Sequence, residues 1–208
     1  MTPGNHDRRD NLRKVFADHS YLTECEGPYL NYVIDDYPVC LIGLDTVVAE
    51  QAYGMMDAER LEWLEKTLGE HSDKPVMVFM HHPPFLTGIT HMDSINCRGG
   101  DDMAAIIAQH PNIERVIAGH HHRPIHMRWA GTVGSIAPSV AHQVLLDLEE
   151  SDFDDAMIKM EPPAFSLHMW EAQTGVVTHQ VYIGEFPGPF EFNLDPDYPA
   201  YKAEPVSQ

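Results

Sequence analysis

The sequence predicts an α/β fold, and two patterns support that prediction. Short apolar runs typical of buried strands alternate with helical segments between residues 57 and 118. Two of these runs, 75–80 and 113–118, end abruptly in histidine-rich segments. In α/β proteins the loops that follow such strands gather at one edge of the sheet and carry functional residues. We therefore expect a sheet with flanking helices and a polar site at the sheet edge.

The first half of the chain predicts two helices and a hairpin. In order these are a helix from about Asp7, strands over 29–34 and 39–44 joined by the turn Asp35-Asp36-Tyr37-Pro38, and a helix over 57–68. The second helix is amphipathic, and Asp57 can cap its start while Gly69 can end it.

The second half predicts one more helix and six strands. In order these are a strand over 75–80, a loop to about Gly100, a helix over 101–109 capped by Asp101, and strands over 113–118, 125–129, 140–148, 164–170 and 176–183, the last two joined by Gln173-Thr174-Gly175. We divide the chain into a core of 1–143, C-terminal strands of 144–185 and a Pro-rich tail of 186–208. The C-terminal strands either form a dimerisation hairpin or close a second sheet.

The charge balance narrows the class of partner. Thirteen Lys and Arg against thirty-two Asp and Glu give a net charge of −19, which opposes binding to nucleic-acid polymers or to an anionic membrane. A small phosphate ester is compatible, because bound divalent cations reverse the field locally. No apolar run of about 18 residues is present, so we expect no membrane-spanning helix. Three widely spaced cysteines favour a reducing compartment, which we take to be the cytoplasm.

Three clusters carry chemistry: Gly4-Asn5-His6-Asp7, His81-His82-Pro83-Pro84 and Gly119-His120-His121-His122. The second and third follow buried strands, which hold imidazoles rigidly, as metal ligation requires. In an extended segment His120 and His122 would point the same way and could face one site or two adjacent ions. Asn5 adds an amide oxygen, and mixed nitrogen and oxygen ligands fit Mn, Fe, Zn or Co better than Ca or Mg.

Each cluster alone has a simpler interpretation. The first could be a turn with a helix cap, the second a polar loop with proline stops, and the third a surface patch or an adventitious nickel site. All three in this order, two of them directly after buried strands, favour a metal centre.

The order of GNHD, HHPP and GHHH resembles the calcineurin-like metallophosphoesterase family. The segment Ala-Pro-Ser-Val-Ala-His-Gln at 137–143 is similar to the branch that contains class III cyclic-nucleotide phosphodiesterases and bacterial glycerophosphodiesterases. The resemblance covers Gly4 to about Ile183. It implies two mixed β-sheets packed as a sandwich with flanking helices, with 1–143 as the catalytic core. It also implies hydrolysis of a small phosphodiester, either a cyclic nucleotide or a glycerophosphodiester, through a hydroxide activated by two divalent metal ions.

The resemblance assigns the metal ligands. Asn5, His81 and His120 would bind one ion, and His122 would bind the other. The ions themselves would be Mn, Fe, Zn or Co.

The remaining histidines receive other roles from the same resemblance. His6 would be the catalytic residue that contacts the phosphate and assists the leaving oxygen, and His142 would lie near the substrate. Asp7 and His82 would support the site without binding metal directly. His121 should point away from the metals.

The chain departs from the family pattern near its start. The family has an Asp-x-His on the first strand and a Gly-Asp after the next, and no Asp-x-His occurs in these 208 residues. We therefore expect the first strands of the sheet to be missing, with Met1 an internal methionine of a longer gene. A processed fragment and a degenerate homologue are the alternatives. The chain as given would then hold one ion rather than two, and its own activity would be weak or absent.

Two alternatives to a phosphodiesterase stay open. A phosphomonoesterase of the same fold would be separated from it by comparing turnover of a monoester and a diester. A non-catalytic metal-binding module, which the absent Asp-x-His favours, would bind metal without hydrolysis. A homo-oligomer built through the C-terminal strands is compatible with any of these functions.

Overall fold

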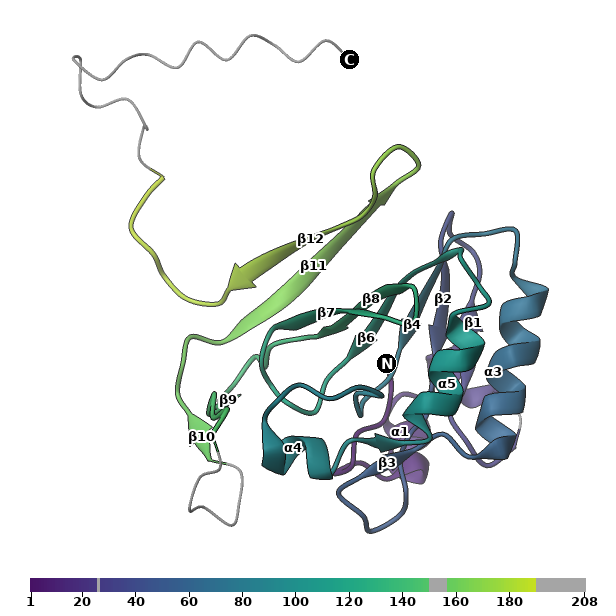
Figure 1. Ribbon diagram of the computed structural model, residues 1–208, viewed down its shortest axis with the longest axis horizontal. Helices are drawn as coiled ribbons and strands as arrows, with labels where there is room; N and C mark the ends of the chain where they lie inside the picture. The colour runs from purple at the N-terminus through teal and green to yellow at the C-terminus, as the bar shows by residue number, and fades with distance from the viewer. Residues whose placement is uncertain (26, 150–156, 190–208) are drawn as a thin grey trace, which may run out of the picture.

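The computed structural model describes residues 1–25, 27–149 and 157–189. Its centre is a six-stranded mixed sheet in the order β1-β2-β4-β6-β8-β7 (Figure 1). The strands are Tyr32–Ile34 (β1), Cys40–Gly43 (β2), Val76–Phe79 (β4), Ile113–Ala118 (β6), Ile125–Trp129 (β7) and Thr132–Ile136 (β8). The middle four run parallel, and β1 and β7 pair antiparallel at the two edges. The carboxyl ends of the parallel strands therefore meet at one edge of the sheet.

Two helices, α3 (Ala58–Glu70) and α5 (Gly100–Ile107), cover one face of this sheet. Leu64 and Leu68 of α3 and Met103 and Ile107 of α5 are almost fully buried in a core shared with the strands. Burial of a Leu side chain contributes about 1.5–3 kcal/mol. These four residues therefore fix both helices to the sheet.

The helix termini were predicted in part. Asp57 caps α3 as expected, since its carboxylate accepts a hydrogen bond from the backbone N–H of Arg60 at 3.1 Å. Two predictions were wrong: α3 continues through Gly69, and α5 begins after Gly99 rather than after Asp101. Gly99 has a φ of 81°, and a Cβ there would lie 2.3 Å from the Met56 carbonyl oxygen, so the turn into α5 requires glycine.

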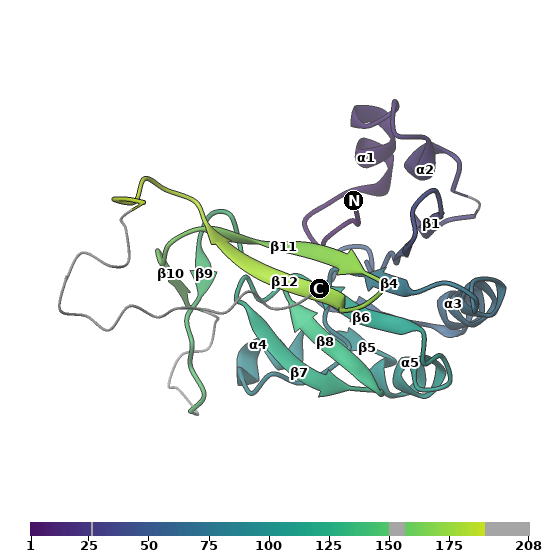
Figure 2. The same cartoon turned by 90° about the horizontal axis from the view of Figure 1, so that it is seen from above.

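A hairpin of β11 (Ala164–Glu171) and β12 (Gly175–Tyr182) covers the opposite face (Figure 2). Trp170 and Val176 pack on Val39, Met77 and Ile117 of the main sheet. The molecule is therefore layered, with helices, mixed sheet and hairpin in that order. The α/β prediction with more than one sheet is confirmed, and the second layer is an antiparallel pair of strands.

The remaining elements are short. They are α1 (Arg9–Val15), α2 (Ser20–Thr23), β3 (Gly54–Met55), α4 (Thr90–Ser94), β5 (Cys97–Arg98), β9 (Gln143–Val144) and β10 (Ile158–Lys159). Helices α1 and α2 lie together, apart from α3 and α5 (Figure 2). Within the described residues, no helix is long and apolar enough to cross a membrane.

Two further sequence predictions differ from the structure. The strand β8 was not predicted, and the strand expected over 140–148 is reduced to Gln143–Val144. Val140, Leu146 and Leu148 are exposed, so their apolar pattern does not reflect burial in a sheet. The predicted tail lies outside the described residues except for 186–189, which form no helix or strand.

Candidate metal centre

Polar segments follow three adjacent parallel strands at the carboxyl edge of the sheet. Asp45 and Thr46 follow β2, His81 and His82 follow β4, and the segment 119–122 follows β6. The N–H of Gly119 donates to the carbonyl of His81 at 2.9 Å, which fixes the two histidine segments side by side. The prediction that these clusters end buried strands is confirmed.

His81 and His120 face each other at this edge, with ring centroids 5.1 Å apart. The Nε2 atom of His81 also lies 3.0 Å from the Oδ1 atom of Asn5. The fold therefore brings together the three residues that were expected to bind one metal. A nitrogen from each of His81, His82 and His120 lies within 4.8 Å of the others, which is a spacing that can hold an ion.

His82 is already fully hydrogen-bonded by the protein. Its Nε2 atom lies 3.1 Å from the carbonyl of Ala52, and its Nδ1 atom lies 2.8 Å from the hydroxyl of Thr46. The carbonyl can only accept, so Nε2 carries the proton and Nδ1 accepts from Thr46. Binding a metal would break one of these bonds, and His82 is therefore better suited to orient its neighbours than to bind an ion itself.

Two buried imidazole nitrogens at this edge have no hydrogen-bond partner in the described parts of the chain, Nε2 of His120 and Nδ1 of His122. Leaving a buried polar atom unpaired costs about 1–3 kcal/mol. Burial lowers the pKa of His120 to about 2 and the pKa of His81 to about 3, and neighbouring imidazoles add to both shifts. Neutral imidazoles keep a lone pair for a metal. The donor set fits a divalent transition metal.

The segment that carries His120 and His122 is a tight turn. Their φ angles are 66° and 52°, in the left-handed region that residues other than glycine rarely adopt. The expectation that this segment is extended was therefore wrong. His120 packs near His81 and His82, whereas His122 lies against His142, with ring centroids 4.8 Å apart. Backbone strain of this kind is typical of functional sites.

His121 is completely buried and is held by the protein. Its Nε2 atom lies 2.7 Å from Oδ1 of Asn96, and its Nδ1 atom lies 3.3 Å from the hydroxyl of Thr87. The ring therefore anchors the turn to the loop before and after α4.

The segment Gly4-Asn5-His6-Asp7 is a closed turn. The N–H of Gly4 donates to Oδ2 of Asp7 at 2.8 Å, and the N–H of Asp7 donates to the carbonyl of Gly4 at 2.9 Å. Asp7 thus fixes the turn instead of capping α1, which has Arg8 at its N-cap. His6 is exposed on this turn, so its ring is open to a ligand.

Asp45 was missed by the sequence prediction, although it connects this turn to the sheet. Its buried carboxylate receives two hydrogen bonds from the guanidinium of Arg9, and it also accepts from the N–H groups of Leu30 and Val47. The available signal was its position directly after the apolar run 39–44, the same position that His81 has after 75–80.

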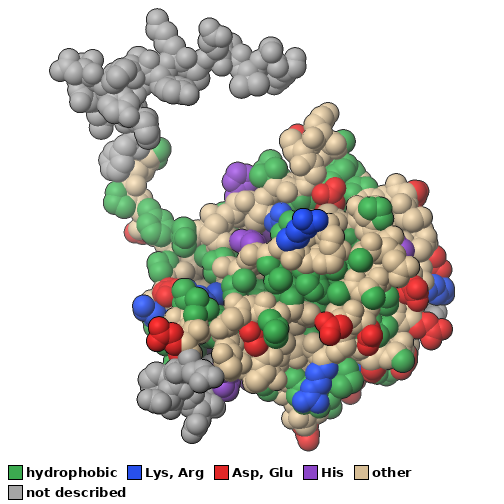
Figure 3. Space-filling model, in the orientation of Figure 1, with side chains coloured by type: hydrophobic (Ala, Val, Ile, Leu, Met, Phe, Trp, Pro, Cys, Tyr) green, Lys and Arg blue, Asp and Glu red, His purple; other side chains and the backbone are tan. Residues whose placement is uncertain are grey.

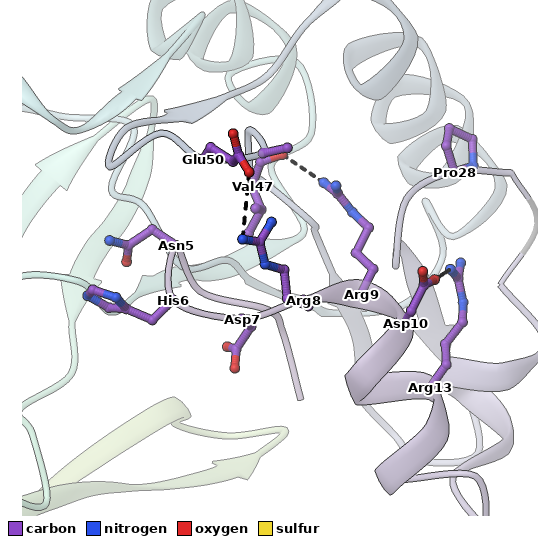
Figure 4. A pocket seen from close by; sticks show the side chains of 11 residues that line it. Asn5, His6, Asp7, Arg8, Arg9, Asp10, Arg13, Pro28, Val47 and Glu50 are labelled. Atoms are coloured by element: carbon purple, nitrogen blue, oxygen red, sulfur yellow. Dashed lines mark hydrogen bonds and ion pairs between the residues drawn. The ribbon is translucent and has the colours of Figure 1, made fainter.

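A pocket of about 600 Å³ opens beside Asn5 and His6 (Figure 4). Arg8 points across it to Glu50, with 3.8 Å between Nη2 and Oε1, and Arg9 points to the carbonyl of Val47. The residues that line the pocket are Asn5, His6, Asp7, Arg8, Arg9, Asp10, Arg13, Pro28, Val47, Ala49 and Glu50.

These features define a class of protein: an α/β protein with a candidate transition-metal centre at the carboxyl edge of its parallel strands. Residues 1–124 match the family model described as calcineurin-like phosphoesterase. The chain belongs to the calcineurin-like phosphoesterase family, whose members are hydrolytic enzymes.

Similar proteins agree with this assignment. The chain is 39% identical over 193 residues to a protein of Arcobacter nitrofigilis named "Probable glycerophosphodiester phosphodiesterase", covering 92% of this chain and 69% of that protein. It is 32% identical over 180 residues to a Rhodopseudomonas palustris protein named "Probable cyclic nucleotide phosphodiesterase", covering 85% of this chain and 64% of that protein. A dimetal phosphatase from Danio rerio shares the fold with a TM-score of 0.51 at 15% identity, covering 86% of this chain and 70% of that one.

Proposed function

We propose that this protein is a metal-dependent phosphodiesterase that acts on a small diester, a glycerophosphodiester or a cyclic nucleotide. Asn5, His81 and His120 meet at one sheet edge, and a buried nitrogen of His120 has no partner among the described residues; this observation carries the proposal. The names of the two relatives support the choice of a diester. The net charge of −19 supports a small substrate over a nucleic-acid polymer.

The residues have distinct roles in this proposal. Asn5, His81 and His120 would hold one divalent ion, and His122 would contribute to a second. Such ions supply a more acidic water and offset charge on the phosphoryl oxygens. The metal is one of Mn, Fe, Zn or Co, which imidazole and amide ligands suit.

His6 would act directly on the substrate. Its exposed ring lies on the turn next to Asn5 and lines the pocket, so it can donate a hydrogen bond to a phosphoryl oxygen and a proton to the departing oxygen. His142 packs against His122 and would contact the far side of the substrate. Asp7 and His82 would hold the turn and the neighbouring rings in place.

Hydrolysis of bis(p-nitrophenyl) phosphate with added Mn²⁺, compared with EDTA, tests the proposal. We expect metal-dependent turnover that is weak, because no Asp-x-His is present in these 208 residues. We expect His120→Ala to lower this turnover by at least about 100-fold. The matched control is His110→Ala, because His110 lies in the loop before β6, at the amino end of that strand and away from the candidate metal centre. Unchanged metal-dependent turnover in His120→Ala would refute the assignment of the site.

The same assay separates the competing functions. Faster turnover of p-nitrophenyl phosphate than of the diester would indicate a phosphomonoesterase. Mn²⁺ binding without turnover of either compound would indicate a metal-binding module.

We further propose that the hairpin joins two copies of the chain. Phe165, Leu167, Met169 and Val177 are exposed on the hairpin face that points away from the sheet. Because Trp170 and Val176 already close the inner face, the outer apolar face is available to a second copy. We expect a dimer in light scattering and a monomer for Leu167→Glu. A monomeric wild-type protein would refute this assembly.

The three cysteines form no disulfide, which supports a reducing compartment, and we propose the cytoplasm.

A further inference from the structure

A second polar groove, of about 310 Å³, lies where the hairpin crosses the β6-β8-β7 side of the sheet. It is lined by Arg115, His126, Val133, Thr178 and Gln180. None of these residues belongs to the candidate metal centre or to the pocket beside His6. Basic and histidine side chains lie next to one another below the hairpin on the face drawn in Figure 3.

Arg115 is held in a fixed orientation by the hairpin. Its Nη1 atom donates to the hydroxyl of Thr178, and the same hydroxyl lies 2.8 Å from Nδ1 of His168. A guanidinium can only donate, so the hydroxyl of Thr178 accepts from Arg115 and keeps its own O–H to donate to Nδ1 of His168. The hydrogen bond to Thr178 uses one of the five N–H groups of the guanidinium. Thr178 and His168 therefore preorganise a donor whose other N–H groups remain for a ligand.

Arg115 has no carboxylate partner in the described parts of the chain. Glu114 is the acidic group that acts on Arg115, but its carboxylate accepts from Nε1 of Trp170 at 3.2 Å. Burial and then the guanidinium of Arg115 lower the pKa of His126 and of His168, so these two imidazoles are neutral N–H donors beside one cation. In a chain of net charge −19, a cluster of Arg115, His126 and His168 with an unpaired guanidinium is unexpected unless an anion occupies it.

Two buried atoms at the same place also lack partners. Within the described residues, Nε of Arg115 and Oγ of Ser135 form no hydrogen bond. Ser135 is directly opposite His126 in the antiparallel β7-β8 pair, so both side chains lie on the face that carries the groove. The cluster therefore contains more donors than the protein itself satisfies.

We propose that this groove binds a small oxyanion of the phosphate type. The planar guanidinium of Arg115 pairs with two oxygens of such an anion, and His126 and Gln180 donate from the two sides. Bound there, the anion links β7 to β12 and holds the hairpin on the sheet. This site is independent of the candidate metal centre and of the proposed phosphodiesterase activity.

Titration of the metal-free protein with inorganic phosphate in EDTA tests the proposal, because EDTA removes the competing metal centre. The readout is the NMR signals of the imidazole rings, with sodium chloride at equal ionic strength as the reference titration. We expect saturable shifts of His126 and His168 with phosphate and no shift of His110, which lies in the loop between α5 and β6 and does not line the groove. No saturable shift at His126 and His168, or equal shifts with chloride, would overturn the proposal.

Variants identify the residue that binds the anion. We expect Arg115→Gln to weaken phosphate binding by about tenfold or more, since a hydrogen-bonded charge is removed. We expect His126→Gln to weaken phosphate binding as well, and His110→Gln, its matched control outside the groove, to leave the affinity unchanged. If Arg115→Gln lowers the Tm but keeps the wild-type phosphate affinity, Arg115 only links hairpin and sheet, and the proposal fails. If Arg115→Gln does not fold, the wild-type titration and His126→Gln decide the question.

Discussion

Individual glycines determine how closely the backbone approaches the candidate ligands. A Cβ on Gly4 would lie 2.8 Å from Cε1 of His81, and a Cβ on Gly54 would lie 2.4 Å from the ring of His82. Real side chains do not tolerate such separations, so the rings would have to move. These two glycines therefore position the histidines as much as the strands do.

We expect Gly4→Ala to weaken Mn²⁺ binding by about tenfold, because the Cβ displaces the ring of His81 from Asn5. Isothermal titration calorimetry measures the affinity. An affinity within about twofold of the wild type would show that the ring position does not depend on this contact.

The matched control is Gly69→Ala. Gly69 lies inside α3 with nothing near its missing Cβ, so alanine meets no obstacle there. We expect the substitution to raise the free energy of unfolding by about 1 kcal/mol without changing metal affinity. Urea denaturation measures this, and a destabilised variant would contradict the argument.

At the scale of elements, helix α1 is attached to the strand ends through the side chain of Arg9, which pairs with Asp45 and donates to the carbonyl of Val47. Arg9 of α1 contacts Asp45, whose carboxylate is fully buried after β2. No residue of α1 is itself buried, so apolar packing contributes little to its position. The position of Asn5 and His6 therefore depends on a charge interaction.

We expect Arg9→Ala to lower the free energy of unfolding by about 3 kcal/mol, because it leaves the Asp45 carboxylate buried without its partner. Arg13→Ala is the control: Arg13 lies 4.0 Å from an exposed Asp10, and such a pair contributes at most about 1 kcal/mol. Urea denaturation of the two variants distinguishes the cases. Equal effects would mean that the Arg9 pair does not hold α1.

The sequence predicted the elements whose own residues carry the signal and missed those set by neighbours. The buried strands over 75–80 and 113–118 and the helix after Asp57 are apolar or amphipathic in themselves. β8 was missed because Gly134 and Ser135 are poor strand formers, yet Gly134 is required there: a Cβ would lie 2.6 Å from the ring of Phe85.

The candidate site was predicted to a similar extent. The sequence motifs predicted which histidines gather at the sheet edge, because those histidines directly follow buried strands whose ends fix their position. The tight turn at His120 and His122 could not be predicted, since it results from two residues in the left-handed region. The ion pair between Arg9 and Asp45 could not be predicted either, because the two residues are 36 positions apart in the sequence.

At the scale of the whole molecule, the reactivity of the cysteine thiols shows whether the core is exposed to solvent. Burial raises the pKa of Cys40 to about 11 and the pKa of Cys97 to about 12, and both side chains are buried in the main core. Cys25 is partly exposed. Thiol reactivity requires the thiolate and access to solvent.

We therefore expect one thiol, Cys25, to react with a thiol reagent in the native protein and all three to react in denaturant. A Cys25→Ser variant should then be unreactive until it unfolds, and its labelling rate should follow global opening. The absorbance of the chromophore that the thiol reagent releases measures the number of reactive thiols and the labelling rate. Rapid native labelling of two or three thiols would show that the core opens locally.

The distance along the chain between Asn5 and His81, 76 residues, has a consequence for folding. Their contact requires β2, β4 and β6 to be in register first, and parallel pairing across such long chain separations is slow. The site is then among the last features to form during refolding. Refolding in the presence of Co²⁺ would make this delay visible. The visible absorption of the bound cobalt should appear later than the far-UV circular dichroism of the helices. The interval between the two signals is the time that the chain needs to complete its sheet.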